Sequence, residues 1–273
     1  MVQQFRSEFD PAQIKGLLLD LDGVIYQGHR LIAGNKKAFR MIRDRETPVL
    51  FITNTTSVSR LHLREKLRGL GLSCSPEEIL NAPRAAAEFL HSKGIRKCLL
   101  LAPETCADDF IELGIDPHPP ESGDVTVPAV VVGDLGERFT FPVMNKAFLA
   151  LREGALFVSM SPNRYWMSPN GLVLDSGPYV AALEYAIGRK ALLTAKPNPS
   201  IFLEACRLLK LPPENVLMVG DDVEVDIDGA QKAGLPAVLV KTGKYQRRDE
   251  TLIDPPPHGV VKNLLELMTH LGE

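Results

Sequence analysis

A short apolar run that ends in two acids is the feature that most constrains the fold of this chain. Residues 16–19 read Gly-Leu-Leu-Leu, and Asp20, Asp22 and Gly23 follow closely. A run of this length between polar boundaries is typical of a buried β-strand. A strand followed by a plain Asp-Gly turn is one interpretation. The other is that the acids lie at the carboxyl end of a parallel strand, where open α/β sheets bind ligands. A hairpin is disfavoured, because the residues after Tyr26 do not alternate as a partner strand would.

Apolar runs alternate with segments of helical periodicity along the chain. Strands are expected at 17–19, 48–53, 97–101, 127–133, 155–159, 215–219 and 237–240, and helices at 35–45, 57–70, 84–93, 104–113, 141–152, 179–187, 200–209, 225–233 and 262–271. This alternation predicts an α/β fold with parallel strands and right-handed crossovers. The pattern changes near Pro83 and resumes after Leu192. We therefore predict a core formed by residues 1–82 and 191–273, interrupted by an inserted α/β domain at 83–190.

Composition argues against several classes of protein. The 273 residues carry a net charge of −3, so we expect neither a nucleic-acid partner nor a membrane partner. No apolar run approaches the roughly 20 residues of a membrane span, and the first residues lack the apolar segment of a signal peptide. The four cysteines are scattered, without the spacing of a zinc site. We expect a cytoplasmic location, where thiols stay reduced.

Polar residues follow three further predicted strands, as Asp20 follows the first. In chain order they are Thr53, Asn54, Lys196, Asp221 and Asp222. Because the carboxyl ends of parallel strands lie along one edge of a sheet, we expect these side chains to converge. The Thr hydroxyl and the Asn amide would then donate hydrogen bonds to a phosphate, and the Lys would add a positive charge.

Three carboxylates in one crevice, from Asp20, Asp22 and Asp221, would repel one another unless a cation lies among them. Oxygen ligands of this kind favour Mg²⁺, which keeps water and phosphate oxygens in its coordination shell. The set suits phosphoryl transfer, in which positioning and charge stabilisation provide most of the catalysis. An Asp can itself be the nucleophile, which replaces one difficult step by two easier ones.

The acidic run 221–228 permits another interpretation, a calcium loop that begins at Glu224. Its twelfth position would be Leu235, where a bidentate Glu is required, so we reject it. The sequence contains neither the G-x-x-x-x-G-K-[ST] loop of nucleotide-binding proteins nor the G-x-S-x-G motif of esterases. Neither of those enzyme classes is therefore indicated.

Taken together, the clusters resemble the four motifs of the haloacid dehalogenase (HAD) superfamily. In order they are Asp20-x-Asp22-Gly23-Val24, Thr53-Asn54, Lys196-Pro197 and Gly220-Asp221-Asp222-x-x-x-Asp226. The likeness covers nearly the whole chain. The insert between the second and third motifs resembles the large α/β cap of subgroup IIA, which contains the p-nitrophenyl phosphatases, and residues 171–179 and 242–245 are also similar to phosphatases of that subgroup. One departure is Ala195, where relatives usually have Gly. The resemblance implies a Rossmann-like core with a parallel sheet, plus an inserted α/β cap domain.

The same resemblance implies a role for each site residue. The catalytic residues would be Asp20, Asp22 and Lys196. Asp20 would be the nucleophile that becomes an aspartyl-phosphate, and Asp22 the general acid and base. Mg²⁺ would be held by the Asp20 side chain, the Asp22 backbone carbonyl and Asp221. Asp222 and Asp226 would orient Lys196 and the water ligands of the metal. The transferring phosphoryl group would be bound by Gly23, Thr53, Asn54 and Lys196.

The sequence thus predicts a Mg²⁺-dependent phosphatase for a small phosphorylated metabolite, such as a phosphomonoester, a phosphoamino acid or pyrophosphate. A homodimer through the cap is what the relatives imply. The alternative is a phospho-acceptor receiver or non-enzymatic binding module that uses the same strand-end Asp, which has no need of so large an insert. Cleavage of carbon–halogen or carbon–phosphorus bonds is disfavoured, because an acid two residues after the nucleophile marks phosphate-ester chemistry in this superfamily.

Overall fold

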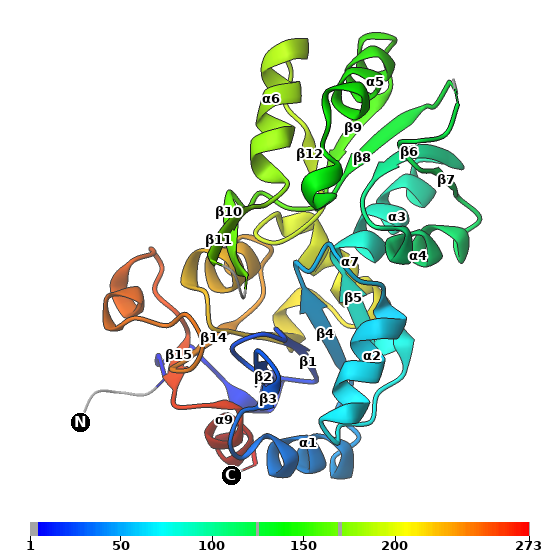
Figure 1. Cartoon of the computed structure of the whole chain (residues 1–273). Helices are drawn as coiled ribbons and strands as arrows, with labels where there is room; N and C mark the ends of the chain where they lie inside the picture. The colour runs from blue at the N-terminus through cyan, green and yellow to red at the C-terminus, as the bar shows by residue number, and fades with distance from the viewer. Residues whose placement is uncertain (1–4, 124–125, 169–170, 273) are drawn as a thin grey trace. The chain divides into compact units, whose positions relative to one another are not determined.

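The computed structural model describes residues 5–123, 126–168 and 171–272 (Figure 1). The strands are β1 Gly16–Leu19, β2 Tyr26–Gln27, β3 Arg30–Leu31, β4 Val49–Thr53, β5 Ile79–Asn81, β6 Lys97–Leu101, β7 Asp116–His118, β8 Ala129–Val132, β9 Leu156–Ser159, β10 Tyr165–Ser168, β11 Gly171–Leu174, β12 Leu192–Leu193, β13 Val216–Gly220, β14 Ala237–Val240 and β15 Gly259–Val261. The helices are α1 Asn35–Asp44, α2 Arg60–Gly69, α3 Ala82–Ser92, α4 Ala107–Ile111, α5 Phe141–Arg152, α6 Gly177–Ile187, α7 Pro199–Leu209, α8 Gly229–Lys232 and α9 Leu264–His270.

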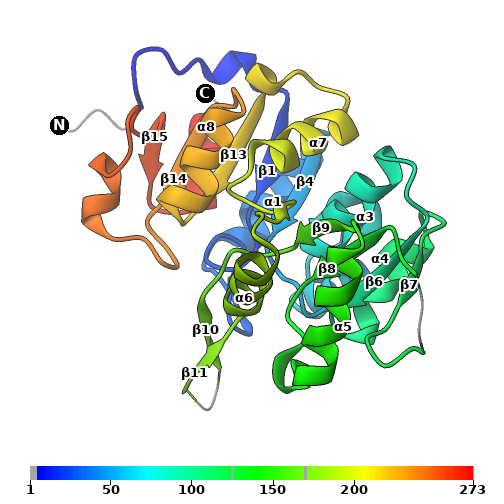
Figure 2. The ribbon, with the colours of Figure 1, turned by 90° about the horizontal axis from the view of Figure 1, so that it is seen from above.

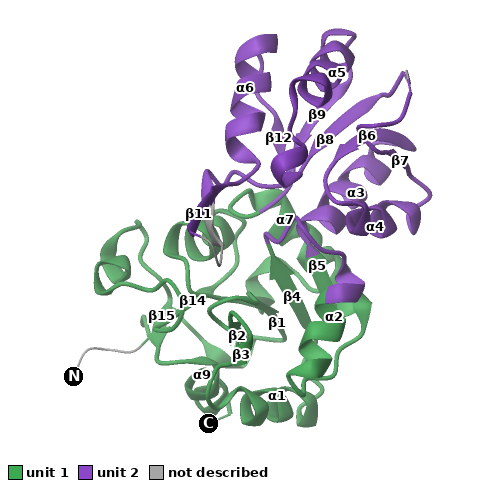
Figure 3. Ribbon diagram, viewed as in Figure 1, with its two compact units in different colours: residues 1–53, 63–80, 196–273 green, residues 54–62, 81–195 purple. Residues whose placement is uncertain are grey.

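The chain divides into two compact units (Figure 3). Unit 1 comprises residues 1–53, 63–80 and 196–273, and unit 2 comprises 54–62 and 81–195. The units differ from the predicted domains at 54–62, 81–82 and 191–195, which the structure groups with unit 2. The physical reasons are local: Arg60 pairs with the buried Asp109 at 2.7 Å, and β12 adds to β9 as a parallel strand.

Unit 1 is built on a six-stranded sheet in the order β15-β14-β13-β1-β4-β5. The pairs of β1 with β4 and with β13 are parallel, as are β13 with β14 and β14 with β15. Every residue of β1, β4 and β13 is buried, as expected for parallel strands covered on both faces. Helix α7 contacts α8 on one face of the sheet (Figure 2), and α1 contacts α9. The predicted parallel α/β fold is confirmed.

The residues after β1 do not pair back onto it. They form a separate antiparallel hairpin in which Tyr26 of β2 lies opposite Leu31 of β3. This hairpin was not predicted, because two residues per strand are too few to show an alternating pattern. The hairpin matters for the site because the Tyr26 carbonyl of β2 accepts a hydrogen bond from the Gly23 amide, which closes the turn that carries Asp22.

Unit 2 contains a second parallel sheet, in the order β12-β9-β8-β6-β7. Alternate side chains of the central strands β6, β8 and β9 enter two separate apolar clusters. Leu100 and Val131 pack in one cluster with residues of α3 and α4, whereas Leu99 and Val130 pack in the other with residues of α5 and α6. Both faces of the sheet are therefore covered by helices, which explains the continuous apolar runs in the sequence.

Among the described residues, none of the helices combines the length and the apolar character needed to cross a bilayer.

Candidate active site

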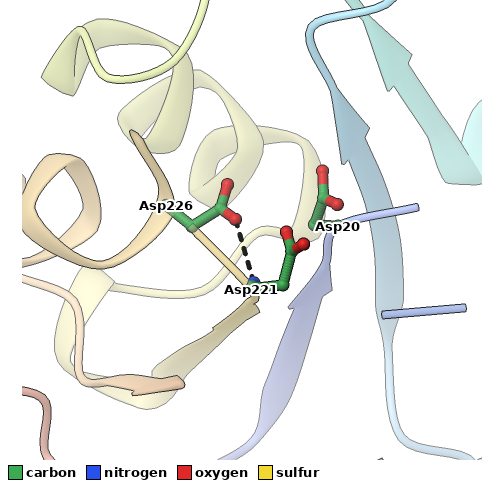
Figure 4. A group of neighbouring side chains, drawn as sticks. All are labelled: Asp20, Asp221 and Asp226. Carbon is green, nitrogen blue, oxygen red and sulfur yellow. Dashed lines mark hydrogen bonds between the residues drawn. The ribbon is translucent and has the colours of Figure 1, made fainter. Parts of the chain in front are cut away.

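Asp20 occupies the first position beyond β1, in the middle of the unit 1 sheet. Its amide continues the strand ladder by donating to the Val219 carbonyl at 3.0 Å. Asp221 occupies the equivalent position beyond the neighbouring strand β13. Because the two strands are parallel and in register, Leu19 facing Val219, both acids emerge at the same edge of the sheet. The convergence predicted from the strand ends is therefore present for this pair (Figure 4).

Three buried carboxylates form a cluster at this edge. Asp20, Asp221 and Asp226 each place an oxygen within 4.8 Å of the others. Burial raises the pKa of Asp20, Lys196 opposes that shift and the charges of Asp226 and Asp221 add to it, which brings the pKa to about 8. Burial, together with Asp226, also raises the pKa of Asp221 to about 6. Three carboxylates thus outnumber the one lysine beside them, and their hard oxygen donors fit a divalent cation.

Lys196 is the cation that the structure places beside this cluster. Its Nζ lies 2.6 Å from Asp20 Oδ1 and 2.6 Å from Asp226 Oδ1, and it also donates to the Ile52 carbonyl at 3.2 Å. Burial alone would lower the pKa of this ammonium, but the two carboxylates outweigh that effect and raise it. Lys196 is therefore a permanent charge that fixes the orientation of Asp20.

Both oxygens of Asp226 already have partners. Oδ1 binds Lys196, and Oδ2 accepts hydrogen bonds from the amides of Asp221 and Asp222 at 3.2 Å each. The side chain of Asp226 thus holds both the lysine and the chain turn that presents Asp221. This geometry agrees with the orienting role implied by the family resemblance, and it leaves Asp20 and Asp221 as the carboxylates directed toward a cation.

A π-helical turn, Val223–Asp228, brings Asp226 back to the strand end. A helix was predicted at 225–233; the chain is helical there, but residues 225–228 form part of the π-turn and the α-helix covers only 229–232. The Asp222 side chain accepts from the amides of Glu224 and Val225, at 3.2 and 3.1 Å, which starts the turn. A π-turn of this kind is uncommon and often lies at functional sites. Regular α-helix follows only in α8.

Asp221 rests in a cradle made largely of backbone. A Cβ on Gly23 would lie 2.1 Å from Asp221 Oδ2, and one on Gly243 would lie 1.9 Å from it. The Lys244 amide donates to Oδ2 at 2.7 Å, and the Thr242 hydroxyl donates to the Gly23 carbonyl. Two glycines therefore allow the close approach that positions this ligand. From the sequence, residues 242–244 were noted only as part of the family resemblance. Isolated polar residues in a loop form no periodic pattern that would predict their role.

Asp22 differs from the other acids because its side chain is exposed. Among the described residues, its side chain accepts one hydrogen bond, a long contact of 3.4 Å from the Gly28 amide to Oδ1. Asp22 does not join the three-carboxylate cluster. Coordination of a metal ion by its backbone carbonyl stays a prediction. The neighbouring Gly23 amide donates to the Tyr26 carbonyl at 2.7 Å. The predicted contact of that amide with a phosphate is therefore not supported in this conformation.

Thr53 is the last residue of β4, the strand beside β1, and its side chain is buried. It lies at the same edge of the sheet as Asp20. Asn54 follows it and is half-buried. A direct role of either residue in phosphate binding stays a prediction.

Two residues near Asp22, Lys66 and Asn35, were not predicted from the sequence. The Lys66 ammonium lies 3.6 Å from the centre of the Tyr26 ring, where burial lowers its pKa although the charge of Asp22 opposes that shift. Asn35, at the start of α1, is buried against the turn after Asp22. Each is a single polar residue on a helix, and neither gives a sequence signal by itself.

A parallel α/β sheet with buried acids and a lysine at its carboxyl edge defines a Rossmann-like enzyme. Residues 17–116 match the family described as haloacid dehalogenase-like hydrolase, and residues 193–267 match one described as HAD-hydrolase-like. The chain belongs to the haloacid dehalogenase-like hydrolases.

Individual relatives match over almost the full chain. Rattus norvegicus haloacid dehalogenase-like hydrolase domain-containing protein 2 is 36% identical over 258 residues, covering 94% of this chain and 96% of that protein. The Homo sapiens phospholysine phosphohistidine inorganic pyrophosphate phosphatase is 35% identical over 261 residues, covering 93% of each chain.

Solved structures share the fold. The 4-nitrophenylphosphatase of Thermotoga maritima superposes with a TM-score of 0.85 at 27% identity, covering 95% of this chain and 98% of that one. The glycerol phosphate phosphatase of Mycobacterium tuberculosis in complex with magnesium has a TM-score of 0.83 at 28% identity, covering 94% of this chain and 77% of that one.

Proposed function

We propose that this chain is a Mg²⁺-dependent phosphatase that forms an aspartyl-phosphate on Asp20 and acts on a small phosphorylated metabolite. The observation that carries the proposal is the buried Asp20 carboxylate, held 2.6 Å from Lys196 in a cluster where three carboxylates share that one lysine. The family membership supports hydrolysis, and phosphatases among the relatives and structural neighbours support a phosphate substrate. A phosphomonoester, a phosphoamino acid and pyrophosphate are the substrate classes we propose.

The donor set fits Mg²⁺. Asp20 and Asp221 would hold the ion with the Asp22 carbonyl, and the magnesium complex of a structural neighbour supports this choice. The ion would supply positive charge that stabilises the charge on the transferring phosphoryl group.

The residues of the chain divide the chemistry into two steps. In the first, Asp20 attacks phosphorus, the bond to the leaving oxygen breaks, and Asp22 gives that oxygen a proton. In the second, Asp22 takes a proton from water, the water oxygen attacks phosphorus, and the bond to Asp20 breaks to release inorganic phosphate. Lys196 favours the ionised form of Asp20 and orients it, and Thr53 and Asn54 would donate hydrogen bonds to the phosphoryl oxygens.

The variant Asp20→Asn tests the proposal, with p-nitrophenyl phosphate and Mg²⁺ in the assay. We expect hydrolysis to fall by several orders of magnitude, because the nucleophile is lost. Asp44→Asn is the matched control, since Asp44 is an exposed acid at the end of α1 and makes no contact with the site. It should retain the wild-type rate. Wild-type turnover by Asp20→Asn would refute the mechanism.

A phospho-acceptor receiver that uses the same Asp predicts a different time course. In a rapid-quench experiment, the phosphatase should show phospho-Asp20 only during turnover, with continuous release of phosphate. A receiver would show a stoichiometric phosphoprotein that persists after the phosphodonor is exhausted. The intact mass of the protein, measured at successive times, separates the two.

The location, the role of unit 2 and the oligomeric state are further proposals. We propose a cytoplasmic location, a role for unit 2 as the cap that selects the substrate, and a homodimer formed through that cap. Size-exclusion chromatography with light scattering tests the last point directly.

A further inference from the structure

We propose that Asn35 is a positioning residue for proton transfer, because its side chain holds the turn that carries Asp22. The inference rests on the function proposed above, in which Asp22 protonates the leaving group. It assigns a role to a residue that belongs to none of the four sequence motifs.

The Asn35 amide makes two hydrogen bonds to consecutive backbone carbonyls. Nδ2 donates to the Val24 oxygen at 2.7 Å and to the Ile25 oxygen at 2.8 Å. The side chain is 1% exposed, so water does not compete for these acceptors. Val24 and Ile25 are the second and third residues after Asp22. A buried donor thus fixes the backbone segment that follows Asp22.

Internal hydrogen bonds close the turn but leave carbonyls to be satisfied. The amides of Ile25 and Tyr26 donate to the Leu21 carbonyl at 2.9 and 3.1 Å, and the Gly23 amide donates to the Tyr26 carbonyl. The Val24 carbonyl takes part in none of these bonds, and a buried carbonyl without a donor is costly. Asn35 supplies that donor, so the conformation of the turn depends on it.

The orientation of the Asn35 amide follows from its surroundings. Its Oδ1 is buried and has no hydrogen-bond partner among the described residues. A reversed amide would direct this oxygen at the two carbonyl oxygens, which repel it. Only the observed orientation is compatible with the site, and an isosteric Asp, which has no donor when ionised, would replace two hydrogen bonds by repulsion.

Asp22 depends on this backbone support more than Asp20 does. Asp20 is fixed by the ladder of β1 and by Lys196, whereas the exposed Asp22 side chain has, among the described residues, one long hydrogen bond from the Gly28 amide. Loss of the Asn35 hydrogen bonds should therefore displace the acid while the nucleophile stays in place. This predicts a defect that depends on how much the leaving group needs a proton.

Two aryl esters of nearly the same shape provide the test. Phenyl phosphate releases a basic oxygen that needs protonation, and p-nitrophenyl phosphate releases a stabilised phenolate that does not. For Asn35→Asp and Asn35→Ala we expect kcat/KM to fall on the order of 10²-fold for phenyl phosphate, and less than about tenfold for p-nitrophenyl phosphate. Asp22→Asn should show the same split. The control Asn145→Asp changes an exposed Asn of α5 and should alter neither rate.

The ratio of the two rates is independent of the fraction of folded enzyme, so partial unfolding of a variant does not obscure it. Equal losses for both esters in the Asn35 variants, with the split present in Asp22→Asn, would overturn the inference and leave the proposed function standing. Failure of the wild-type enzyme to hydrolyse either ester would overturn the proposed function, and the inference with it.

Discussion

The Lys196 ammonium lies 2.6 Å from the Asp20 carboxylate although 176 positions of sequence separate them. The same ammonium binds Asp226, 30 positions further on, at the same distance. One buried lysine thus ties the end of β1 to the turn after β13. Because all three charged groups are nearly inaccessible to water, neither carboxylate can replace this partner with solvent.

Removal of this lysine should therefore cost stability as well as activity. We expect Lys196→Met, without added metal, to lower the free energy of unfolding by about 3–5 kcal/mol, because it leaves two buried carboxylates unpaired. Urea titration followed by circular dichroism measures this change. Lys232→Met is the matched control: Lys232 is an exposed partner of Asp228 on the same face of a helix, and its loss should cost about 0.5 kcal/mol or less. Equal effects of the two variants would contradict this interpretation.

The strand-end part of the site could be predicted because its residues lie at the ends of apolar runs. Asp20 and Asp221 follow strands β1 and β13, and Thr53 ends β4; every residue of these strands is buried, and such runs are visible in the sequence. Lys196 is different, because the strand before it, β12, belongs to the sheet of unit 2. The parallel topology then requires the strand ends to share one edge. For the residues at these strand ends, the apolar pattern and the parallel topology give the same position, so the sequence alone was sufficient to predict it.

The supporting residues could not be predicted in this way. Asn35, Thr242 and Lys244 act through contacts with residues between 10 and 219 positions away, and none of them gives a sequence signal of its own. A helix was predicted at 225–233, but helical periodicity does not show that the Asp226 side chain bonds back to the amides of the preceding strand end, which gives the π-turn at 223–228. Specific side-chain hydrogen bonds decide these features, and sequence spacing does not reveal them.

The glycine beside Asp221 should be essential for metal binding. Gly23 has φ +94°, and an added Cβ would lie 2.1 Å from Asp221 Oδ2. We expect Gly23→Ala to displace that carboxylate and to abolish the thermal stabilisation by Mg²⁺. Gly234→Ala is the control, because its φ is +84° and its nearest neighbour would be 3.9 Å away. Both variants should lose roughly 1–2 kcal/mol of folding stability, because Ala is strained at a left-handed φ. Only Gly23→Ala should lose the response to Mg²⁺. Retention of a wild-type response by Gly23→Ala would show that Asp221 is free to move.

Buried thiols in unit 2 should make the protein sensitive to alkali. Burial raises the pKa of Cys98 to about 12, so this thiol stays neutral in the folded chain while it ionises near ~8.5 when unfolded. Its contribution to stability is full below the unfolded pKa and is lost as pH rises toward the folded one, by at most roughly 1.4 kcal/mol per pH unit. Unfolding titrations between pH 8 and 11 should therefore show a shallower decline for Cys98→Ala than for the wild type. Parallel declines would contradict the assignment.

Metal binding should strengthen as pH rises. The carboxyls of Asp20 and Asp221 have pKa values raised to about 8 and about 6 when no cation is present, and a bound cation requires both to be ionised. Binding near neutral pH therefore releases protons, and the apparent affinity for Mg²⁺ increases between pH 5.5 and 8.5. The shift of melting temperature at a fixed Mg²⁺ concentration should be larger at pH 8.5 than at pH 5.5. In Asp20→Asn the part of this dependence above pH 7 should disappear, because only the group that titrates near pH 8 has been removed. A shift that is equal at both pH values, or larger in acid, would show that these carboxylates do not bind the ion.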